Sequence, residues 1–594
     1  MSEEQELPDR GYDAALMRRL LGYLRPYRGH TALALLLLVL QSGLALIGPR
    51  LTEKALDSAI PRQDLALLGL LAAIYLGVLL FEFIVEYGGA LLTTWIGQRV
   101  MYDLRMRIFG HLQRLSISFY DRNPVGRLMT RVTSDVETLN ELFSSGVVTI
   151  FGDVFTLIAI MVMMLAIDLE LALVAFAVIP LVWLTAAIFR RRVREAFRDI
   201  RYRVARLNAY LQERLSGMRV VQLFGREEAS ARRFAELNRE QLDAHLRSIT
   251  IYAVFFPVVE VLTSVAMALL LWYGGLRVLD ETLTVGVLAA FIQYTRRFFQ
   301  PLQDLSEKFN LLQSAMASSE RVFALLDEPV TVVEPANPRR LPVPVAGEVK
   351  FEGVWFRYSP DGPWVLRDIS FTASPGRTIA LVGHTGSGKT TIVNLLLRFY
   401  DPERGRITID GTDIRDLSTA ELRSIIGFVQ QDLFLFTGDI LHNLTLDAPI
   451  LPEAAREAAR RVGADRFIER LPSGYAHRLG ERGRSLSVGE RQLLSFARAL
   501  ALDPRILVLD EATSSVDAEA EAQIQRAIAE LMAGRTSLVV AHRLSTILHA
   551  DEILVLHHGE IRERGSHRDL LAQEGLYQRL YQLQLRGQEF RKIA

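Results

Sequence analysis

The stretch that decides the fold of the second half of the chain is an eight-residue loop, Gly383-His384-Thr385-Gly386-Ser387-Gly388-Lys389-Thr390. It fits the phosphate-binding pattern G-x-x-x-x-G-K-[ST] without a mismatch, and it lies between a β-rich run at 378–382 and a helical run at 392–397. Glycines let backbone N–H groups close around phosphate oxygens at a helix N-terminus. Lys389 would supply charge to the outer phosphates, and Thr390 a ligand for Mg²⁺. We expect this loop, with the adjacent Thr391, to bind a nucleotide.

A second element of such a site follows about 120 residues downstream. Residues 506–510 form an apolar run that ends in Asp510, and Glu511 comes directly after it. Asp510 would hold Mg²⁺ through water, and Glu511 is placed to polarise a water that attacks the γ-phosphate. Taken alone, an apolar run ending in Asp-Glu is as often a plain strand end. The phosphate loop upstream favours the catalytic interpretation.

Composition narrows the classes of protein. The 594 residues are half hydrophobic and carry 68 basic and 68 acidic residues, so no overall charge favours a nucleic-acid partner. There is no cysteine, which excludes disulfides and Cys-ligated zinc. Residues 1–10 are acidic and polar and lack the basic-then-apolar order of a cleaved signal peptide. Membrane insertion would therefore depend on internal apolar segments.

Six apolar stretches predict an all-α membrane domain in the first half of the chain. The first is uncharged for 19 residues, about the length that spans a bilayer core. The stretches lie at 31–49, 65–81, 147–167, 171–189, 249–276 and 283–305. The sixth is weaker because Arg296 and Arg297 interrupt it, although apolar residues continue at helical spacing. An amphipathic cytosolic helix is the alternative for that segment.

The connections between these stretches predict their orientation. Two of them run to some 60 residues and are rich in arginine, which accumulates on the cytoplasmic side of span ends. Both long connections, and both termini, should therefore face the cytosol, with the spans continuing as helices beyond the lipid. Residues 12–27 mix Leu, Met and Tyr with Arg, as expected of a helix lying in the membrane interface.

Polar residues and prolines inside the spans give further expectations. Acidic residues are costly in lipid and should face a cavity or another helix. They are Glu82, Glu86, Asp153 and Glu260. A role in binding cationic or amphipathic cargo is open for them, and helix-to-helix hydrogen bonds are favoured. Pro180 and Pro257 could kink the fourth and fifth spans.

The composition changes near residue 327. A proline-rich stretch indicates a linker, and from residue 347 short β-rich runs alternate with helical stretches, as in a soluble α/β domain. We predict a multi-domain membrane protein: a six-helix transmembrane domain followed by an α/β phosphate-loop domain. The expected parts are a tail and interfacial helix at 1–28, a transmembrane domain at 29–326, a linker at 327–346 and a nucleotide-binding domain at 347–594.

A family resemblance becomes specific ahead of the Asp510 run. Leu486-Ser487-Val488-Gly489-Glu490 resembles the signature sequence of ATP-binding cassette (ABC) proteins, whose consensus is Leu-Ser-Gly-Gly-Gln. Other family elements occur in the family's order, and the resemblance implies their roles. They are Tyr358 for stacking on adenine, Gln431 for contacting Mg²⁺ and the membrane domain, the exporter-specific loop at 480–483, Asp517 in the loop that crosses the dimer interface, and His542 for contacting the γ-phosphate.

The membrane half resembles the same family. Residues 119–128 and 131–135 look like the first intracellular loop of ABC exporters, and residues 213–221 look like the second. The resemblance covers roughly residues 14–583. It implies one half of a multidrug- or lipid-type exporter in the cytoplasmic membrane, with ATP and Mg²⁺ as cofactors and the ATP-binding domain in the cytoplasm. Its ATP site would be complete only across a dimer, where Ser487, Val488, Gly489 and Glu490 contact the partner's ATP.

The signature departs from consensus at two positions. Val488 replaces a glycine and adds bulk where backbone must approach phosphates, and Glu490 replaces a glutamine and adds negative charge. Glu511 and His542 are intact. This combination resembles the catalytically intact chain of bacterial heterodimeric exporters, whose partner has an intact signature and a degenerate catalytic glutamate. A homodimeric lipid or peptide exporter remains the alternative, and an ATP-gated regulator is a further one.

Two other classes fit the sequence less well. A soluble cassette ATPase is excluded by the uncharged 19-residue run. An importer is disfavoured, because importers usually carry spans and cassette on separate chains. The sequence leaves the cargo open beyond amphipathic or hydrophobic molecules.

Overall fold

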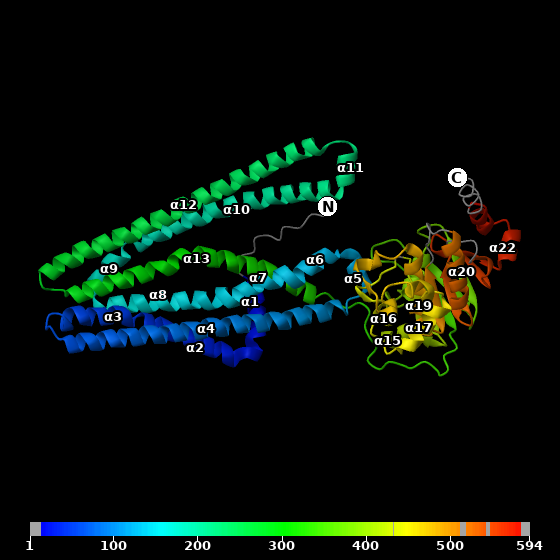
Figure 1. The fold of residues 1–594 in the computed structure, drawn as a ribbon, viewed down its shortest axis with the longest axis horizontal. Helices are drawn as coiled ribbons and strands as arrows, with labels where there is room; N and C mark the ends of the chain where they lie inside the picture. Colours follow the sequence, from blue (N-terminus) through cyan, green and yellow to red (C-terminus); the bar gives the residue numbers. More distant parts are fainter. Residues whose placement is uncertain (1–12, 432, 511–517, 542–546, 584–594) are drawn as a thin grey trace. The chain divides into compact units, whose positions relative to one another are not determined.

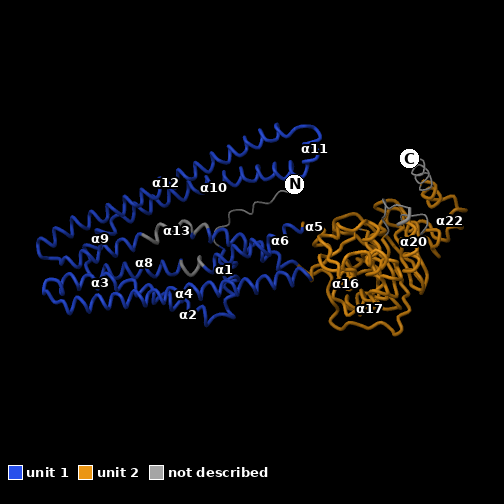
Figure 2. Tube along the Cα trace, in the orientation of Figure 1, with its two compact units in different colours: residues 1–113, 125–328 blue, residues 114–124, 329–594 orange. Residues whose placement is uncertain are grey.

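The structure is a computed structural model that describes residues 13–431, 433–510, 518–541 and 547–583. The chain forms two compact units (Figure 2). The first contains residues 1–113 and 125–328, and the second contains residues 114–124 and 329–594. The short segment 114–124 therefore belongs to the second unit, although it lies within the first half of the sequence.

The described residues of the first unit form helices joined by short turns (Figure 1). Its elements are α1 (Ala14–Leu21), η1 (Gly22–Tyr27), α2 (Arg28–Ala45), α3 (Ile47–Lys54), η2 (Ala55–Ala59), α4 (Leu65–Leu112), α6 (Val125–Thr130), η3 (Arg131–Asp135), α7 (Val136–Glu141), η4 (Leu142–Gly146), α8 (Val147–Ile167), α9 (Leu169–Phe176), α10 (Ile179–Ser216), α11 (Met218–Leu223), α12 (Glu227–Leu279) and α13 (Val285–Leu326). The 48 residues of α4 extend about 72 Å, more than twice the thickness of a bilayer core. A helix of this length that crosses a bilayer extends well beyond the lipid, which agrees with the long helices predicted from the sequence.

Five helical stretches in the described residues are long and apolar enough to cross a membrane. They lie within 14–59, 65–112, 150–167, 169–216 and 227–279. The predicted sixth span forms a 42-residue helix, α13, which is not among the five. Its crossing of the membrane stays a prediction. A buried cluster of this unit joins α8, α9, α12 and α13 through side chains such as Met164, Leu171, Leu270 and Phe291.

The polar residues of the spans have different surroundings. Asp153 on α8 forms an ion pair with Lys308 on α13, so it faces another helix as predicted. Glu82 is half-buried, and Glu86 and Glu260 are exposed on this single chain.

The two prolines also differ in their effect on the helices. Pro180 lies in the first turn of α10, just after the break that separates α10 from α9. A proline is tolerated there because first-turn N–H groups have no partner within the helix. Pro257 lies inside α12, which runs through it as one helix.

Two sets of polar contacts hold the C-terminal end of α13. Arg19 of α1 donates to Asp327 at the end of α13 at 2.6 and 2.7 Å. Buried Asp135, in η3, accepts from Arg321 Nε at 3.0 Å and from the Ser318 hydroxyl at 3.1 Å, both on α13. The end of α13 is therefore tied both to α1 and to η3, the segment that follows α6.

The second unit is an α/β domain with two larger sheets. The six-stranded sheet has the order β12-β11-β3-β10-β9-β6, and the four-stranded sheet has the order β2-β1-β4-β5. The strands are β1 (Val349–Phe356), β2 (Leu366–Ala373), β3 (Thr378–Gly383), β4 (Arg404–Ile409), β5 (Thr412–Asp413), β6 (Ile426–Val429), β7 (Gly438–Asp439), β8 (Arg478–Leu479), β9 (Ile506–Asp510), β10 (Thr536–Val540), β11 (Glu552–His557) and β12 (Glu560–Gly565). The helices are α5 (Ile117–Arg122), α14 (Lys389–Leu396), α15 (Thr419–Ser424), α16 (Ile440–Thr445), α17 (Pro452–Arg461), α18 (Asp465–Ile468), α19 (Val488–Ala501), α20 (Ala518–Met532) and α22 (His567–Ala572).

Strand β3 shows how this sheet is buried on both faces. Ile379 and Leu381 belong to one hydrophobic core, and Ala380 and Val382 belong to the other. Successive side chains of a strand point to opposite faces, so the two cores lie on opposite sides of the sheet. Strands β6, β9, β10, β3 and β11 run parallel, and their carboxyl ends therefore meet at one edge. Ligands bind at such edges in open α/β sheets.

Candidate nucleotide-binding site

The phosphate loop connects β3 to α14 at this carboxyl edge. A side chain at Gly383 would place its Cβ 2.4 Å from the Leu556 carbonyl oxygen and 2.7 Å from the Ser387 hydroxyl, so only glycine fits there. Gly388 precedes α14 with φ +104°, a conformation that favours glycine. Glycine is thus required at the two positions for different reasons: the close approach of backbone at Gly383 and the left-handed conformation at Gly388.

Lys389 begins α14 and turns back over the loop. Its Nζ donates to the carbonyl oxygens of Gly383 at 2.7 Å and His384 at 3.0 Å. Burial lowers the pKa of Lys389, while nearby Asp510 raises it. The ammonium group is therefore held inside the loop, at the N-terminal end of a helix, where an anion would gain from both the charge and the helix N–H groups.

Ser387 gives a test of whether the loop fits phosphate. The residue is 4 % exposed, and its hydroxyl has no hydrogen-bond partner among the described residues. Buried hydroxyls are normally paired, and an orphaned one marks a site for a ligand or water. A phosphate oxygen in the loop would accept this bond, so the residues present fit the phosphates of a nucleotide.

Tyr358 lies just after β1, at a position suited to a base. Its ring is 49 % exposed and packs edge-on against Phe356 and Tyr400, with ring centroids 5.0 and 5.2 Å away. Its hydroxyl lies 3.0 Å from that of Thr391, in the first turn of α14. The ring is held at its edge and tip while part of its surface stays free, which suits stacking on adenine.

Asp510 and Gln431 lie at the same sheet edge as the loop. Asp510 ends β9 and is paired with Val540 of β10, which is also paired with Leu381 of β3. One strand therefore separates Asp510 from β3, a distance of about 10 Å. Gln431 comes two residues after β6 and is exposed. Carboxylate, amide and hydroxyl oxygens suit Mg²⁺, so Asp510 and Gln431 join Thr390 as possible ligands.

The signature residues start α19. Ser487 and Glu490 form a capping box: the Glu490 N–H donates to the Ser487 hydroxyl at 3.2 Å, and the Ser487 N–H donates to the Glu490 carboxylate at 2.8 Å. Val488 is 45 % exposed and, with Gln431 and Asp510, lines a cavity of about 60 Å³. The helix N-terminus therefore already holds a carboxylate, which disfavours a second anion there.

Three predicted residues lie outside the described part of the chain. They are Glu511, Asp517 and His542. The strands that lead to the first and third are described: β9 ends at Asp510, and β10 ends at Val540, two residues before His542.

Our sequence analysis missed a cluster directly after α14. Arg398 is buried and binds the backbone of Val333, and Tyr400 packs against Tyr358 and donates to Asp121 at 2.5 Å. A charged residue followed by two aromatics and an acid, immediately after a phosphate-loop helix, was the available signal. Tyr400 and Asp121 are 279 positions apart, and a single sequence does not indicate contacts over such a separation.

Comparisons with known proteins agree with this site. Residues 31–302 match the family model described as ABC transporter transmembrane region, and residues 366–514 match that described as ABC transporter. The chain is 40 % identical to "Uncharacterized ABC transporter ATP-binding protein YknV" of Bacillus subtilis, covering 98 % of this chain and 96 % of that one.

Two further relatives have more specific names. "Probable multidrug resistance ABC transporter ATP-binding/permease protein YheH" of B. subtilis is 41 % identical, over 88 % of this chain and 77 % of that one. "ATP-dependent lipid A-core flippase" of Syntrophus aciditrophicus is 38 % identical, over 96 % and 95 %. The chain belongs to the ABC transporters, as an exporter-type half-transporter whose cassette binds ATP and couples its hydrolysis to membrane transport.

Proposed function

We propose that this chain is one half of a dimeric exporter that moves amphipathic or hydrophobic cargo across the cytoplasmic membrane by alternating access. The observation that carries the proposal is the presence, in one chain, of a phosphate loop fitted to a nucleotide and of helices long enough to cross a bilayer. The names of relatives, which include a multidrug resistance transporter and a lipid A-core flippase, support this cargo class.

The proposed parts follow the boundaries predicted from sequence: 1–28, 29–326, 327–346 and 347–594. Both termini and the cassette face the cytoplasm, and α13 supplies the sixth span. The family model of the transmembrane region extends to residue 302, inside α13, which supports this assignment.

Each site residue has a proposed role in hydrolysis. The loop at 383–391 binds the phosphates, and Tyr358 stacks on adenine. When bound, Mg²⁺ would neutralise charge on the phosphates. Thr390, Gln431 and Asp510 would hold this ion. Glu511 orients the attacking water and accepts its proton, and His542 contacts the γ-phosphate.

The signature favours a heterodimer with two unequal sites. Residues 487–490 would face the partner's ATP, and there the Glu490 carboxylate already occupies the N-terminus of α19. The exposed Val488 side chain adds bulk at the same place. The site using this signature would be weak, and the site using this chain's Glu511 would hydrolyse ATP against an intact signature of the partner.

The first experiment tests transport. The complex is reconstituted in vesicles, with a fluorescent phospholipid and a fluorescent amphipathic cation as probes. We expect ATP-dependent movement of at least one probe and stimulation of hydrolysis by it. ATP hydrolysis without movement of either probe would favour the regulator and contradict an exporter of this cargo class.

The second experiment tests the asymmetry. Glu511→Gln in this chain alone should nearly abolish hydrolysis by the complex, whereas Glu457→Gln, which changes a surface carboxylate paired with Arg460, should leave it intact. Retention of half or more of the activity in the Glu511 variant would refute the unequal sites. Full hydrolysis by this chain purified alone would favour the homodimer.

A further inference from the structure

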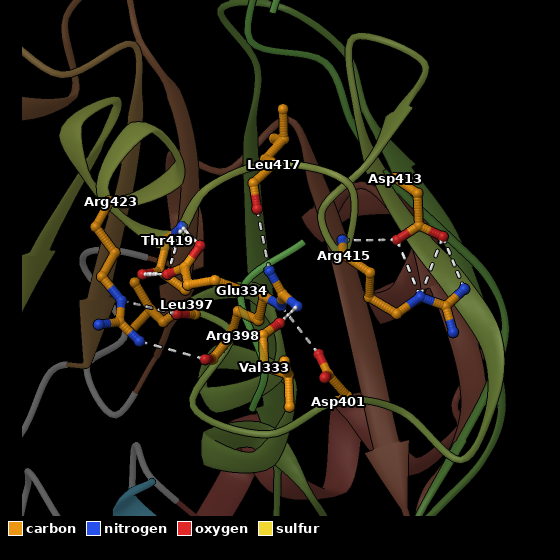
Figure 3. Close-up of polar contacts among 10 residues, drawn as sticks. All are labelled: Val333, Glu334, Leu397, Arg398, Asp401, Asp413, Arg415, Leu417, Thr419 and Arg423. Atoms are coloured by element: carbon orange, nitrogen blue, oxygen red, sulfur yellow. Dashed lines mark hydrogen bonds and ion pairs between the residues drawn. The ribbon is translucent and has the colours of Figure 1, made fainter. Parts of the chain in front are cut away.

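Arg398 lies directly after the phosphate-loop helix and holds the linker. The residue is 3 % exposed, in a left-handed conformation with φ +50°. Its guanidinium group donates to the carbonyl oxygen of Val333 at 2.9 Å, to that of Leu417 at 3.1 Å and to Asp401 at 3.1 Å (Figure 3). One nitrogen of this buried fork thus binds the linker at Val333, and the other two hold the guanidinium group against the cassette beside α14.

The rest of the linker is fastened in the same manner. Next to Val333, Glu334 accepts from the Thr419 N–H at 3.1 Å and from its hydroxyl (Figure 3). Further along, the Arg339 N–H donates to the Asp416 carbonyl at 2.8 Å. Asp410 accepts from three successive N–H groups, those of Ala346, Gly347 and Glu348. The proline-rich segment at 329–346 is therefore bound to the cassette at several points, and we call it the strap.

Tyr400, two residues after Arg398, binds α5, which lies in the segment 114–124 of the second unit. Its hydroxyl donates to Asp121 of α5 at 2.5 Å, and its buried ring packs against Tyr358, with centroids 5.2 Å apart. The strap and α5 are also joined directly, because the Thr331 hydroxyl donates to that of Ser116, 2.7 Å away.

The two segments held by these contacts are those through which the chain enters its second unit. The chain passes between its two units at only three points, at the ends of 114–124 and at the start of 329–594. Both of these segments are tied to residues 398–401, which directly follow the helix that begins with Lys389. Tyr400 further connects them to Tyr358, the proposed adenine residue.

We propose that residues 398–401 form a junction that fixes the strap and α5 to the nucleotide site, with Tyr400 as the positioning residue that transmits nucleotide occupancy to Asp121. The inference rests on the proposed function. Adenine stacking would fix the Tyr358 ring, the ring fixes Tyr400, and the Tyr400 hydroxyl fixes α5. Burial and, second, the bond to Asp121 raise the pKa of Tyr400, so its hydroxyl stays a donor at any assay pH.

The test changes single groups at the junction. Tyr400→Phe keeps the ring and deletes the hydroxyl, and Asp121→Asn removes the acceptor's charge. The matched control is Tyr577→Phe, another buried tyrosine of the cassette, whose hydroxyl lies 2.6 Å from His567 Nδ1. Each variant is measured in the reconstituted complex for ATP affinity, basal hydrolysis and stimulation of hydrolysis by the fluorescent phospholipid and amphipathic cation.

We expect Tyr400→Phe to keep ATP affinity and basal hydrolysis within about twofold, and to lower the stimulation about tenfold, as for loss of a hydrogen bond to a charged group. Asp121→Asn keeps an oxygen that can accept this bond but removes its charge, so it should lower the stimulation by less. The double variant should be no worse than Tyr400→Phe alone, because that variant already lacks the bond. Tyr577→Phe should keep full stimulation. A wild-type level of stimulation in Tyr400→Phe, or an equal loss in Tyr577→Phe, would overturn the junction.

A second measurement uses the absence of cysteine in this chain. Ser116→Cys with Thr331→Cys should crosslink readily and still transport, because the junction holds strap and α5 as one body. Loss of transport on crosslinking would show that they must separate, which overturns the proposal. If the wild type shows no probe-stimulated hydrolysis, the proposed function itself fails. If only the Tyr400 variants behave like wild type, the function stands and the junction fails.

Discussion

Replacing Ser387 by alanine should change the stability of the phosphate loop and its affinity for ATP in opposite directions. The Ser387 hydroxyl is buried without a partner among the described residues, and such a group costs about 1–3 kcal/mol. Alanine removes that cost and keeps the backbone bond from residue 387 to the His384 carbonyl, 3.1 Å long. Without nucleotide, the loop should therefore be more stable by about 1–2 kcal/mol.

The same substitution removes a donor to a charged phosphate. A hydrogen bond to a charged group contributes about 1.5–3 kcal/mol, so the ATP affinity should fall by a factor of about 10–100. Thr391, in the first turn of the adjoining helix α14, provides the matched control, because its hydroxyl is paired with that of Tyr358 at 3.0 Å. Thr391→Val deletes a satisfied bond and should lower the stability of the loop by about 0.5–1.5 kcal/mol.

Hydrogen exchange measured by mass spectrometry on the full chain reports the stability of residues 383–397 without nucleotide. Displacement of a fluorescent ATP analogue reports the affinity. Ser387→Ala should slow exchange in this segment and weaken ATP binding, while Thr391→Val should speed exchange. Faster exchange in Ser387→Ala, or an unchanged ATP affinity, would contradict the conclusion that the Ser387 hydroxyl lacks a partner until it binds phosphate.

Two further predictions concern other parts of the chain. Asp135→Asn should lower the protection of η3 against hydrogen exchange by about 1–3 kcal/mol, because it removes the charge of a buried carboxylate that accepts from Arg321. Glu137→Gln, whose partner Arg105 is on the surface, should cost less than about 1 kcal/mol, and an equal cost would contradict the role of burial. Glu490→Gln keeps a capping box but removes the charge at the N-terminus of α19, so ATP affinity at the weak site of the complex should rise about 2–30-fold, measured by nucleotide binding stoichiometry. No rise would remove the electrostatic reason for unequal sites.

Local patterns explain why much of the site could be predicted from the sequence. The phosphate loop required a strand, two special glycines and a helix, and β3, Gly383, Gly388 and α14 supply them at the predicted places. The same holds for the strand that ends at Asp510. The long helices were also predictable, because apolar residues recur at helical spacing along them.

Long-range pairing was not predictable. Asp153 and Lys308 are 155 residues apart, and nothing in either segment indicates the other. The predicted sixth span shows the same limit, because Arg297 interrupts its apolar pattern. In the structure this guanidinium group donates to the carbonyl of Ala45, at the break between α2 and α3. A charge that counts against a span in the sequence is thus paired with backbone in the fold.

The strap shows that a proline-rich composition does not by itself make a segment mobile. Its prolines predict the absence of helix and strand, and this follows from their missing N–H groups and fixed φ. The remaining N–H groups still need acceptors, and the carboxylate of Asp410 alone supplies three. An irregular segment can therefore be as firmly held as a strand when its donors meet fixed acceptors. Because Arg398 holds the strap from the end of α14, a movement of the phosphate-loop helix would displace the strap together with it, without any flexible spacer to absorb the motion.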